Sequence, residues 1–83
     1  MTVPQKVQAA TRRIAEILRQ RSSLLAEQVE QILDIRSLPL QVRERIIDEL
    51  GNEFAEKGLR PDDEPNEYGL ELESLTDLCS EKR

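Results

Sequence analysis

Four oxygen-bearing side chains give the sequence its clearest potential for chemistry. They have the spacing of positions 1, 3, 5 and 12 in a calcium-binding loop: Asp62, Glu64, Asn66 and Glu73. Such a loop needs glycine at position 6 for a sharp turn, whereas this chain has Glu67 there, directly after Pro65. We therefore interpret the stretch as a solvated acidic loop or a partner-contact loop, and we predict no metal ion or other cofactor.

The residue types that most enzymes use are scarce. The chain has no histidine, one cysteine and three glycines. Without histidine, the commonest general base and metal ligand is missing, and Cys79 has no usual partner to activate its thiol. Three separate glycines also form no phosphate-binding or dinucleotide-binding loop. We predict that the protein is not an enzyme, and that Cys79 is a small buried core residue.

Charge divides the chain into two unlike halves. The net charge is −5, but residues 1–45 carry eight Lys or Arg against five Asp or Glu, and residues 46–83 carry four against twelve. Five basic side chains of the first half could contact nucleic-acid phosphates: Lys6, Arg12, Arg13, Arg19 and Arg21. Because the whole chain is acidic, it would repel nucleic acid at long range, so we do not expect a nucleic-acid partner.

Composition favours α-helices. Charged residues make up 35% of the 83 residues and aromatic residues 2%, which suits amphipathic helices better than β-strands. We predict one small all-α domain, residues 1–83. No apolar stretch is long enough for a membrane span or a signal peptide, and one cysteine cannot form a disulfide within the chain. We therefore expect a cytoplasmic protein.

The best-defined helix is predicted over about 38–57. Ser37 can cap its start, Pro39 fits its first turn, and Gly58 can adopt the left-handed conformation that closes a helix. Apolar side chains recur along one face of this segment. Three of them are the predicted core: Ile46, Leu50 and Phe54.

The first half predicts one long helix over about 4–35, because no Gly or Pro interrupts it. Arg21 would fall in the middle of its apolar stripe, and Ser22 and Ser23 are common capping residues, so a bend or break near 21–23 stays open. A short connection should make 25–33 the antiparallel neighbour of 42–54.

The third segment combines a loop and a short helix. Two prolines and dense acid predict a loop over 59–69, and apolar spacing predicts a helix over about 70–80. The acidic residues proposed to contact a partner are Asp62, Asp63, Glu64 and Glu67.

Length provides an argument for a second chain. A helix over 4–35 would be about 48 Å long, and an antiparallel helix of 18 residues covers only about 27 Å of it. Either the last helix or a partner must cover the remaining apolar stripe. We expect a homodimer, with an interface formed by Val7, Ile14, Ile17 and Leu18.

Three functional hypotheses follow. The first is a non-enzymatic, regulatory interaction module, a homodimer that binds a further protein through its acidic half. The second is a small acidic, antitoxin-like inhibitor that blocks a basic nucleic-acid site on an enzyme. The third is a DNA-binding regulator that uses the basic first helix.

Overall fold

The structure, a computed structural model, describes residues 2–81. These residues form helices α1 (Gln5–Arg19), α2 (Ser23–Glu30), α3 (Leu40–Lys57) and α4 (Glu67–Ser80), and the 3-10 turn η1 (Ile35–Ser37) lies between α2 and α3. The predicted all-α class is confirmed.

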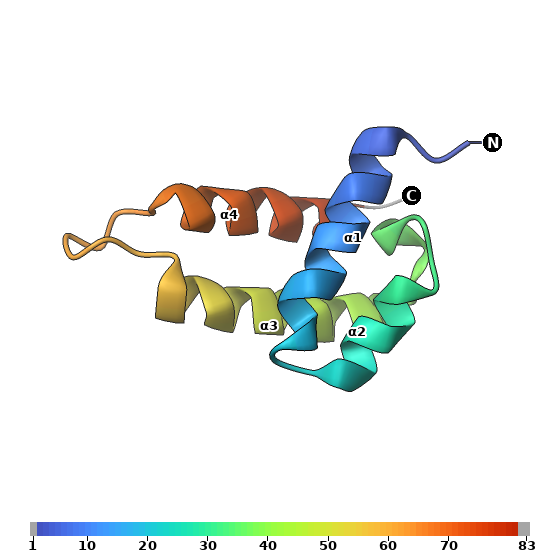
Figure 1. Cartoon of the computed structure of the whole chain (residues 1–83), viewed down its shortest axis with the longest axis horizontal. Coiled ribbons are helices and arrows are strands. Elements are labelled where there is room, and N and C mark those ends of the chain that lie inside the picture. The colour runs from blue at the N-terminus through green and yellow to red at the C-terminus, as the bar shows by residue number, and fades with distance from the viewer. Residues whose placement is uncertain (1, 82–83) are drawn as a thin grey trace.

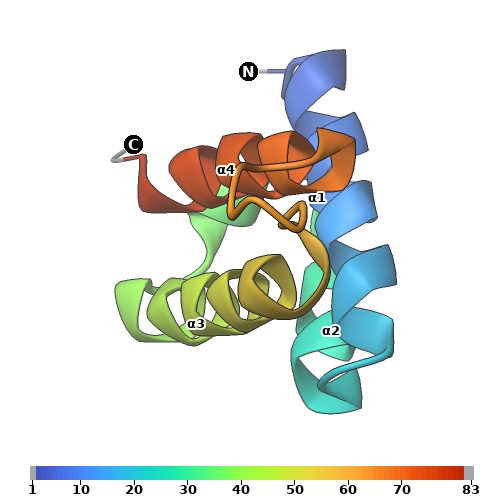
Figure 2. The ribbon, with the colours of Figure 1, turned by 90° about the vertical axis from the view of Figure 1, so that its left-hand side faces the viewer.

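The helices form two pairs. α1 packs along α2, and α3 packs along α4. Figure 1 shows α3 and α4 running antiparallel, with α1 crossing them. Figure 2 shows that α1 and α2 lie on the same side of the α3–α4 pair. The opposite side of α3 and α4 is therefore left without a covering helix.

One continuous helix over 4–35 is wrong, and the alternative of a break near 21–23 is confirmed, because α1 and α2 are separate helices. α1 ends at Arg19, and Ser22 caps α2 by accepting a hydrogen bond from the backbone N–H of Leu25. A straight helix would have placed the charged side chain of Arg21 on the buried stripe, where it would lack water. The break instead turns Arg21 toward acids of α3 and lets α2 fold back onto α1.

Breaking the first helix also changes the neighbours of the later ones. We expected 25–33 to pack against 42–54, but the main neighbour of α2 is α1 and that of α3 is α4. Leu33, expected on the packed face, lies after the end of α2 and is 59% exposed. Buried residues of α2 and α3 share one hydrophobic cluster, although the two helices are not each other's main neighbours.

The predicted ends of α3 are close to the observed ones, but the mechanisms differ. Ser37 belongs to η1, where its hydroxyl donates to the carbonyl of Asp34, and Pro39 occupies the capping position without a side-chain hydrogen bond. Gly58 has a φ of −96°, so the expected left-handed conformation is wrong.

Close packing explains Gly58 instead. A Cβ there would lie 2.9 Å from the carbonyl oxygen of Phe54, and a Cβ on Gly69 would lie 2.1 Å from the carbonyl oxygen of Gly58. These glycines allow the end of α3 and the start of α4 to touch. They set the geometry of the α3–α4 pair.

α4 begins earlier than the predicted helix over 70–80. The side chain of Asn66 accepts a hydrogen bond from the backbone N–H of Gly69 at 2.7 Å, which is N-cap geometry. Glu67 is therefore in the first turn of α4, where a negative charge is favourable, and outside the loop.

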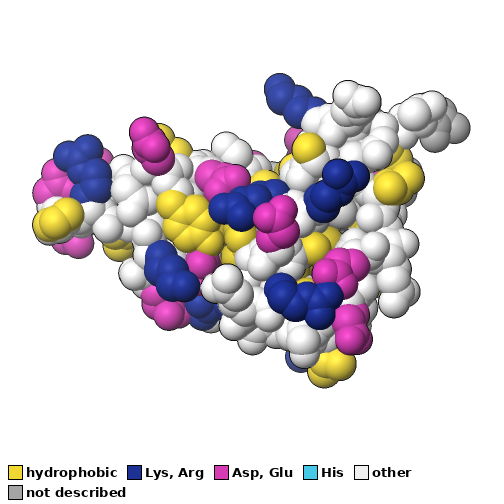
Figure 3. All heavy atoms as spheres, in the orientation of Figure 1, with side chains coloured by type: hydrophobic (Ala, Val, Ile, Leu, Met, Phe, Trp, Pro, Cys, Tyr) yellow, Lys and Arg dark blue, Asp and Glu magenta, His cyan; other side chains and the backbone are white. Residues whose placement is uncertain are grey.

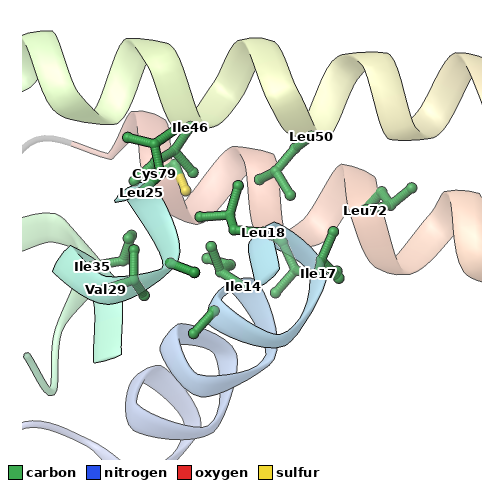
Figure 4. Packing of buried hydrophobic residues seen from close by; sticks show 13 residues of the cluster. Ile14, Ile17, Leu18, Leu25, Val29, Ile35, Ile46, Leu50, Leu72 and Cys79 are labelled. Atoms are coloured by element: carbon green, nitrogen blue, oxygen red, sulfur yellow. The ribbon is translucent and has the colours of Figure 1, made fainter. Parts of the chain in front are cut away.

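One hydrophobic cluster joins all four helices. Figure 4 shows this cluster, in which five large side chains are fully buried: Ile14, Leu18, Ile46, Leu50 and Leu72. The prediction that Ile46 and Leu50 are core residues is confirmed. Phe54, expected beside them, is only partly buried and packs against the edge of the cluster.

Candidate functional site: a groove between α3 and α4

Three of the four residues predicted for a dimer interface lie inside the monomer. Ile14 and Leu18 are 0% exposed and Ile17 is 5% exposed. The broken helix lets α2, α3 and α4 cover them, so the length argument for a second chain no longer holds. A homodimer stays a prediction, but it would need a surface other than these three residues.

The fourth residue of that set, Val7, is half-buried. It lines a hollow of about 430 Å³ between α1 and α4, together with Leu75 and Leu78. Arg36 lies at this hollow but is already paired with Asp34 and Glu81. The charged residues of this hollow that form no ion pair among residues 2–81 are Lys6 and Asp77, whose opposite charges do not favour a partner of one sign.

The acidic loop is a fixed turn. Leu59 pairs with Pro65 in an isolated antiparallel bridge, and the backbone N–H of Arg60 donates to the carbonyl of Glu64 at 2.7 Å. Asp62 forms an ion pair with Arg60 and accepts a hydrogen bond from the backbone N–H of Glu64. Asp63 has a φ of 66°, a conformation that Asp tolerates better than most residues.

The four proposed partner-contact acids do not act as one set. Asp62 is paired within the turn, whereas Asp63, Glu64 and Glu67 form no ion pair with other residues in the range 2–81. Within this range, no three acidic or cysteine side chains are arranged to hold a metal ion.

Most of the basic residues of the first half are used inside the molecule. Arg13 binds Glu71 through two hydrogen bonds of 2.9 and 3.1 Å, and Arg19 pairs with Glu30. Figure 3 shows basic and acidic side chains interspersed on the face that α1 occupies. This face is not the continuous basic surface that phosphate binding requires.

Arg21 forms the largest charge cluster of the described chain. Its guanidinium contacts Glu53 at 2.8 Å, Glu56 at 2.7 Å and Glu49 at 3.2 Å. Tyr68 adds a hydrogen bond of 2.6 Å from its hydroxyl to Glu53. The cluster ties the α1–α2 turn and the start of α4 to one side of α3.

The surroundings of Glu53 control its protonation. Burial raises the pKa of the Glu53 carboxyl, but hydrogen bonds from Tyr68 and Arg21, together with the positive charges of Lys57 and Arg21, bring it below its ordinary value. Burial and the hydrogen bond to Glu53 raise the pKa of Tyr68 to about 12. Because no buried polar side-chain atom here lacks a hydrogen-bond partner, we interpret the cluster as stabilising the fold.

A groove with an apolar floor lies between α3 and α4. It has a volume of about 320 Å³ and is lined by Gly51, Phe54, Leu72, Glu73, Thr76 and Asp77. Neither α1 nor α2 contributes to the lining, because both lie across the other side of the helix pair. The groove is therefore open to another molecule.

Gly51 is the least expected residue of this groove. Glycine inside a helix is about 1 kcal/mol less favourable than alanine. Gly51 has no positive φ, and a Cβ placed on it would meet no atom within 4 Å. Neither the backbone nor internal packing requires glycine, and its missing side chain leaves the groove open beside Phe54.

Acidic side chains line the groove from α4, and further acids lie on the same face of α3. Glu73 and Asp77 line it from α4. Glu44 and Asp48 precede Gly51 by seven and three residues, which places them on the same face of α3. All four are exposed, and none forms an ion pair within the described part of the chain.

Sequence reasoning missed this groove. The sequence pattern indicates only a calcium-loop spacing for Glu73 and only a core position for Phe54. The available signal was Gly51, a glycine in the middle of an otherwise well-formed helical pattern. Which residues face it depends on the α3–α4 pairing, which the sequence pattern did not predict.

Comparisons of the chain with family models, curated proteins and solved structures found no match. Among the helices described, none is both long and apolar enough to cross a membrane.

Proposed function

We propose that the protein is a non-enzymatic helical interaction module that binds another protein in the groove between α3 and α4. The observation that carries the proposal is the open space at Gly51, on the apolar floor beside Phe54 and Leu72. Glycine at position 51 lowers the stability of α3, and no contact within the chain requires it. A side chain of a binding partner that occupies this space would explain the glycine.

The acidic side chains at the border of the groove favour a partner with a basic surface. Glu73 and Asp77 have no described ion-pair partner, whereas the acids that fasten the fold, such as Glu53 and Glu71, are paired. Free acids beside an apolar floor attract a positively charged surface and give it an orientation. We therefore assign the partner binding expected of the acidic half to Glu73 and Asp77.

Both walls of the groove are held in place. Arg21 binds three acids on the other side of α3, and Arg13 binds Glu71 of α4. Arg43 donates to the carbonyls of Cys79 and Glu81 at the end of α4. Because the walls need little rearrangement, a partner would pay a small ordering cost on binding.

The remaining features fit this assignment. Cys79, the one thiol of the chain, is fully buried, and burial raises its pKa to about 12, so it is not a reactive nucleophile. A buried free thiol is also compatible with the reducing cytoplasm that we expect.

A second candidate function uses the acidic turn. Backbone bonds fix the turn at the end of the α3–α4 pair, with the Asp63 and Glu64 side chains exposed and without ion-pair partners in the range 2–81. A rigid acidic tip suits an inhibitor that enters a basic nucleic-acid site on an enzyme.

Affinity purification from cells of the source organism separates the two functions. Wild-type protein is compared with Gly51→Met, which fills the groove, and with Asn52→Met, which adds the same side chain at the neighbouring exposed position. We expect a stoichiometric partner that wild type and Asn52→Met retain and Gly51→Met loses. A partner lost only when Asp63 and Glu64 are neutralised would favour the inhibitor, and no partner in any sample would refute both functions.

A further inference from the structure

We infer that the occupant of the α3–α4 groove is a basic amphipathic helix of another protein, with one bulky apolar side chain over Gly51 and Lys or Arg one turn away. This inference rests on the proposed function and specifies the chemistry of the partner. It follows from the hydrogen-bonding capacity of the groove, its charge and the shape of its floor.

Hydrogen bonding favours a helical occupant. The walls are the middles of α3 and α4, whose backbone N–H and C=O groups bond within each helix. Apart from Thr76 and two carboxylates, the lining offers no polar group. An extended segment would leave its own backbone groups without partners, whereas a helix satisfies them internally.

Charge favours a basic occupant over a second copy of this chain that uses the same face. In a symmetric dimer through this groove, Glu73 and Asp77 of one copy would approach the acids of the other, which is unfavourable. A partner with Lys or Arg would instead pair with these unpartnered carboxylates.

The basic helix of a second copy also fits poorly. The exposed cations of α1 without ion-pair partners among residues 2–81 are Lys6 and Arg12. One hollow at Arg12 is lined by Gln5, Gln8 and Ala9 of α1, which offer no bulky apolar side chain. A second hollow at Arg12 includes Ile32 and Leu33, but these residues follow the end of α2, so α1 itself could supply charge but no anchor for the space at Gly51.

Spacing specifies the pattern of the occupant. Glu73 and Asp77 are four residues apart on α4, which corresponds to about 6 Å along the axis. A partner helix presents two cations at a similar distance when they are three or four residues apart. An apolar residue on the same face, such as Leu or Met, would then reach the floor between Phe54 and Leu72.

Three synthetic peptides of about 18 residues, long enough to form helices, test the inference. The first carries Leu with two Lys on the same helical face, each three or four residues from the Leu; the second replaces Lys with Glu, and the third keeps Lys but replaces Leu with Ala. Binding to the full chain is measured by fluorescence anisotropy at several salt concentrations. We expect the Leu/Lys peptide to bind most tightly, with an affinity that falls as salt increases.

Variants of the protein localise that binding. Gly51→Met should weaken the Leu/Lys peptide by about tenfold or more, since the anchor loses its space. Glu73→Gln with Asp77→Asn should weaken binding and reduce its salt dependence. Asn52→Met is the control for the first change. Glu16→Gln with Glu27→Gln, two exposed acids of α1 and α2 away from the groove, is the control for the second. Both controls should bind like wild type.

The contrary outcomes are distinct. Tight, Gly51-dependent binding of the Leu/Glu or the Lys/Ala peptide would overturn the basic, apolar-anchored occupant while leaving a groove that binds protein. Binding that Gly51→Met does not change would overturn the inference and would count against the proposed function too. A concentration-dependent dimer abolished by Gly51→Met would replace the foreign helix with a second copy.

Discussion

Arg21 and Glu53 are 32 residues apart in sequence, yet their side chains form an ion pair with an N–O distance of 2.8 Å. Glu53 is 5% exposed, and the same carboxylate accepts a hydrogen bond from Tyr68. This contact explains why the chain breaks between α1 and α2. It also holds α3 from the side opposite the groove.

Removing Arg21 should therefore destabilise the fold. Arg21→Met keeps an apolar stem but leaves the buried Glu53 carboxylate with only Tyr68 and the more distant Lys57, which should cost about 1–3 kcal/mol. Arg19→Met removes an exposed ion pair with Glu30 and should change stability little. Urea denaturation of the three proteins measures the difference. Equal losses for both variants would show that the cluster has no special structural role.

Tyr68 provides a test of the same cluster at high pH. The pKa of its hydroxyl is raised to about 12 from an ordinary 10, so the folded state holds this proton more tightly than the unfolded state. Its contribution to stability is complete below pH 10 and is lost as pH rises toward 12.

The chain has one tyrosine, so ultraviolet absorbance of tyrosinate reports this group alone. We expect a midpoint near 12 in the folded wild type, and a lower midpoint in Glu53→Gln, which removes the negative charge. Circular dichroism records at each pH whether the helices persist. A midpoint near 10 with full helix content would contradict the hydrogen bond to Glu53.

Two glycine substitutions should have opposite effects. Gly51→Ala adds a methyl group to open space and should stabilise the helix by about 0.5–1 kcal/mol. Gly69→Ala places a Cβ 2.1 Å from the carbonyl oxygen of Gly58 and should destabilise by about 1–3 kcal/mol. Thermal and urea denaturation measure both. A loss of stability in Gly51→Ala would mean that the fold itself needs glycine there, which would remove the main support for the groove.

The Ile14→Glu variant tests whether Ile14 is a core residue of the monomer or a residue of a dimer interface. Because Ile14 is fully buried, a carboxylate there should destabilise the monomer by at least about 3 kcal/mol. Leu24→Glu, at a site 72% exposed, should leave the fold intact. Circular dichroism and light scattering give helix content and mass. A well-folded Ile14→Glu monomer formed from a wild-type dimer would support the interface predicted from the sequence and contradict this packing.

The parts of the fold that the sequence predicted well are those with local causes. The apolar spacing around Ile46 and Leu50 and the breakers near Pro39 and Gly58 are enough to delimit α3 within about two residues. The all-α class likewise follows from composition and helical spacing.

The parts that it predicted poorly depend on contacts between distant residues. Arg21 was a visible irregularity in an apolar stripe, but no local pattern identifies three acids on α3 as its partners. The burial of Phe54 depends on which helix covers it. Gly58 and Gly69 allow close contact between the end of α3 and the start of α4, a role that is visible only once these helices are paired. The groove belongs to this second class.

Site-specific photo-cross-linking tests the central claim most directly. A photoreactive amino acid replaces Thr76, in the lining of the groove, or Gln28, on the exposed side of α2. After irradiation in cells of the source organism, we expect one defined protein cross-linked to position 76, absent from position 28 and lost when Gly51→Met is added. The cross-linked segment should be helical and rich in Lys or Arg. Equal cross-linking at both positions, or a product at position 76 that Gly51→Met leaves unchanged, would contradict a binding groove between α3 and α4.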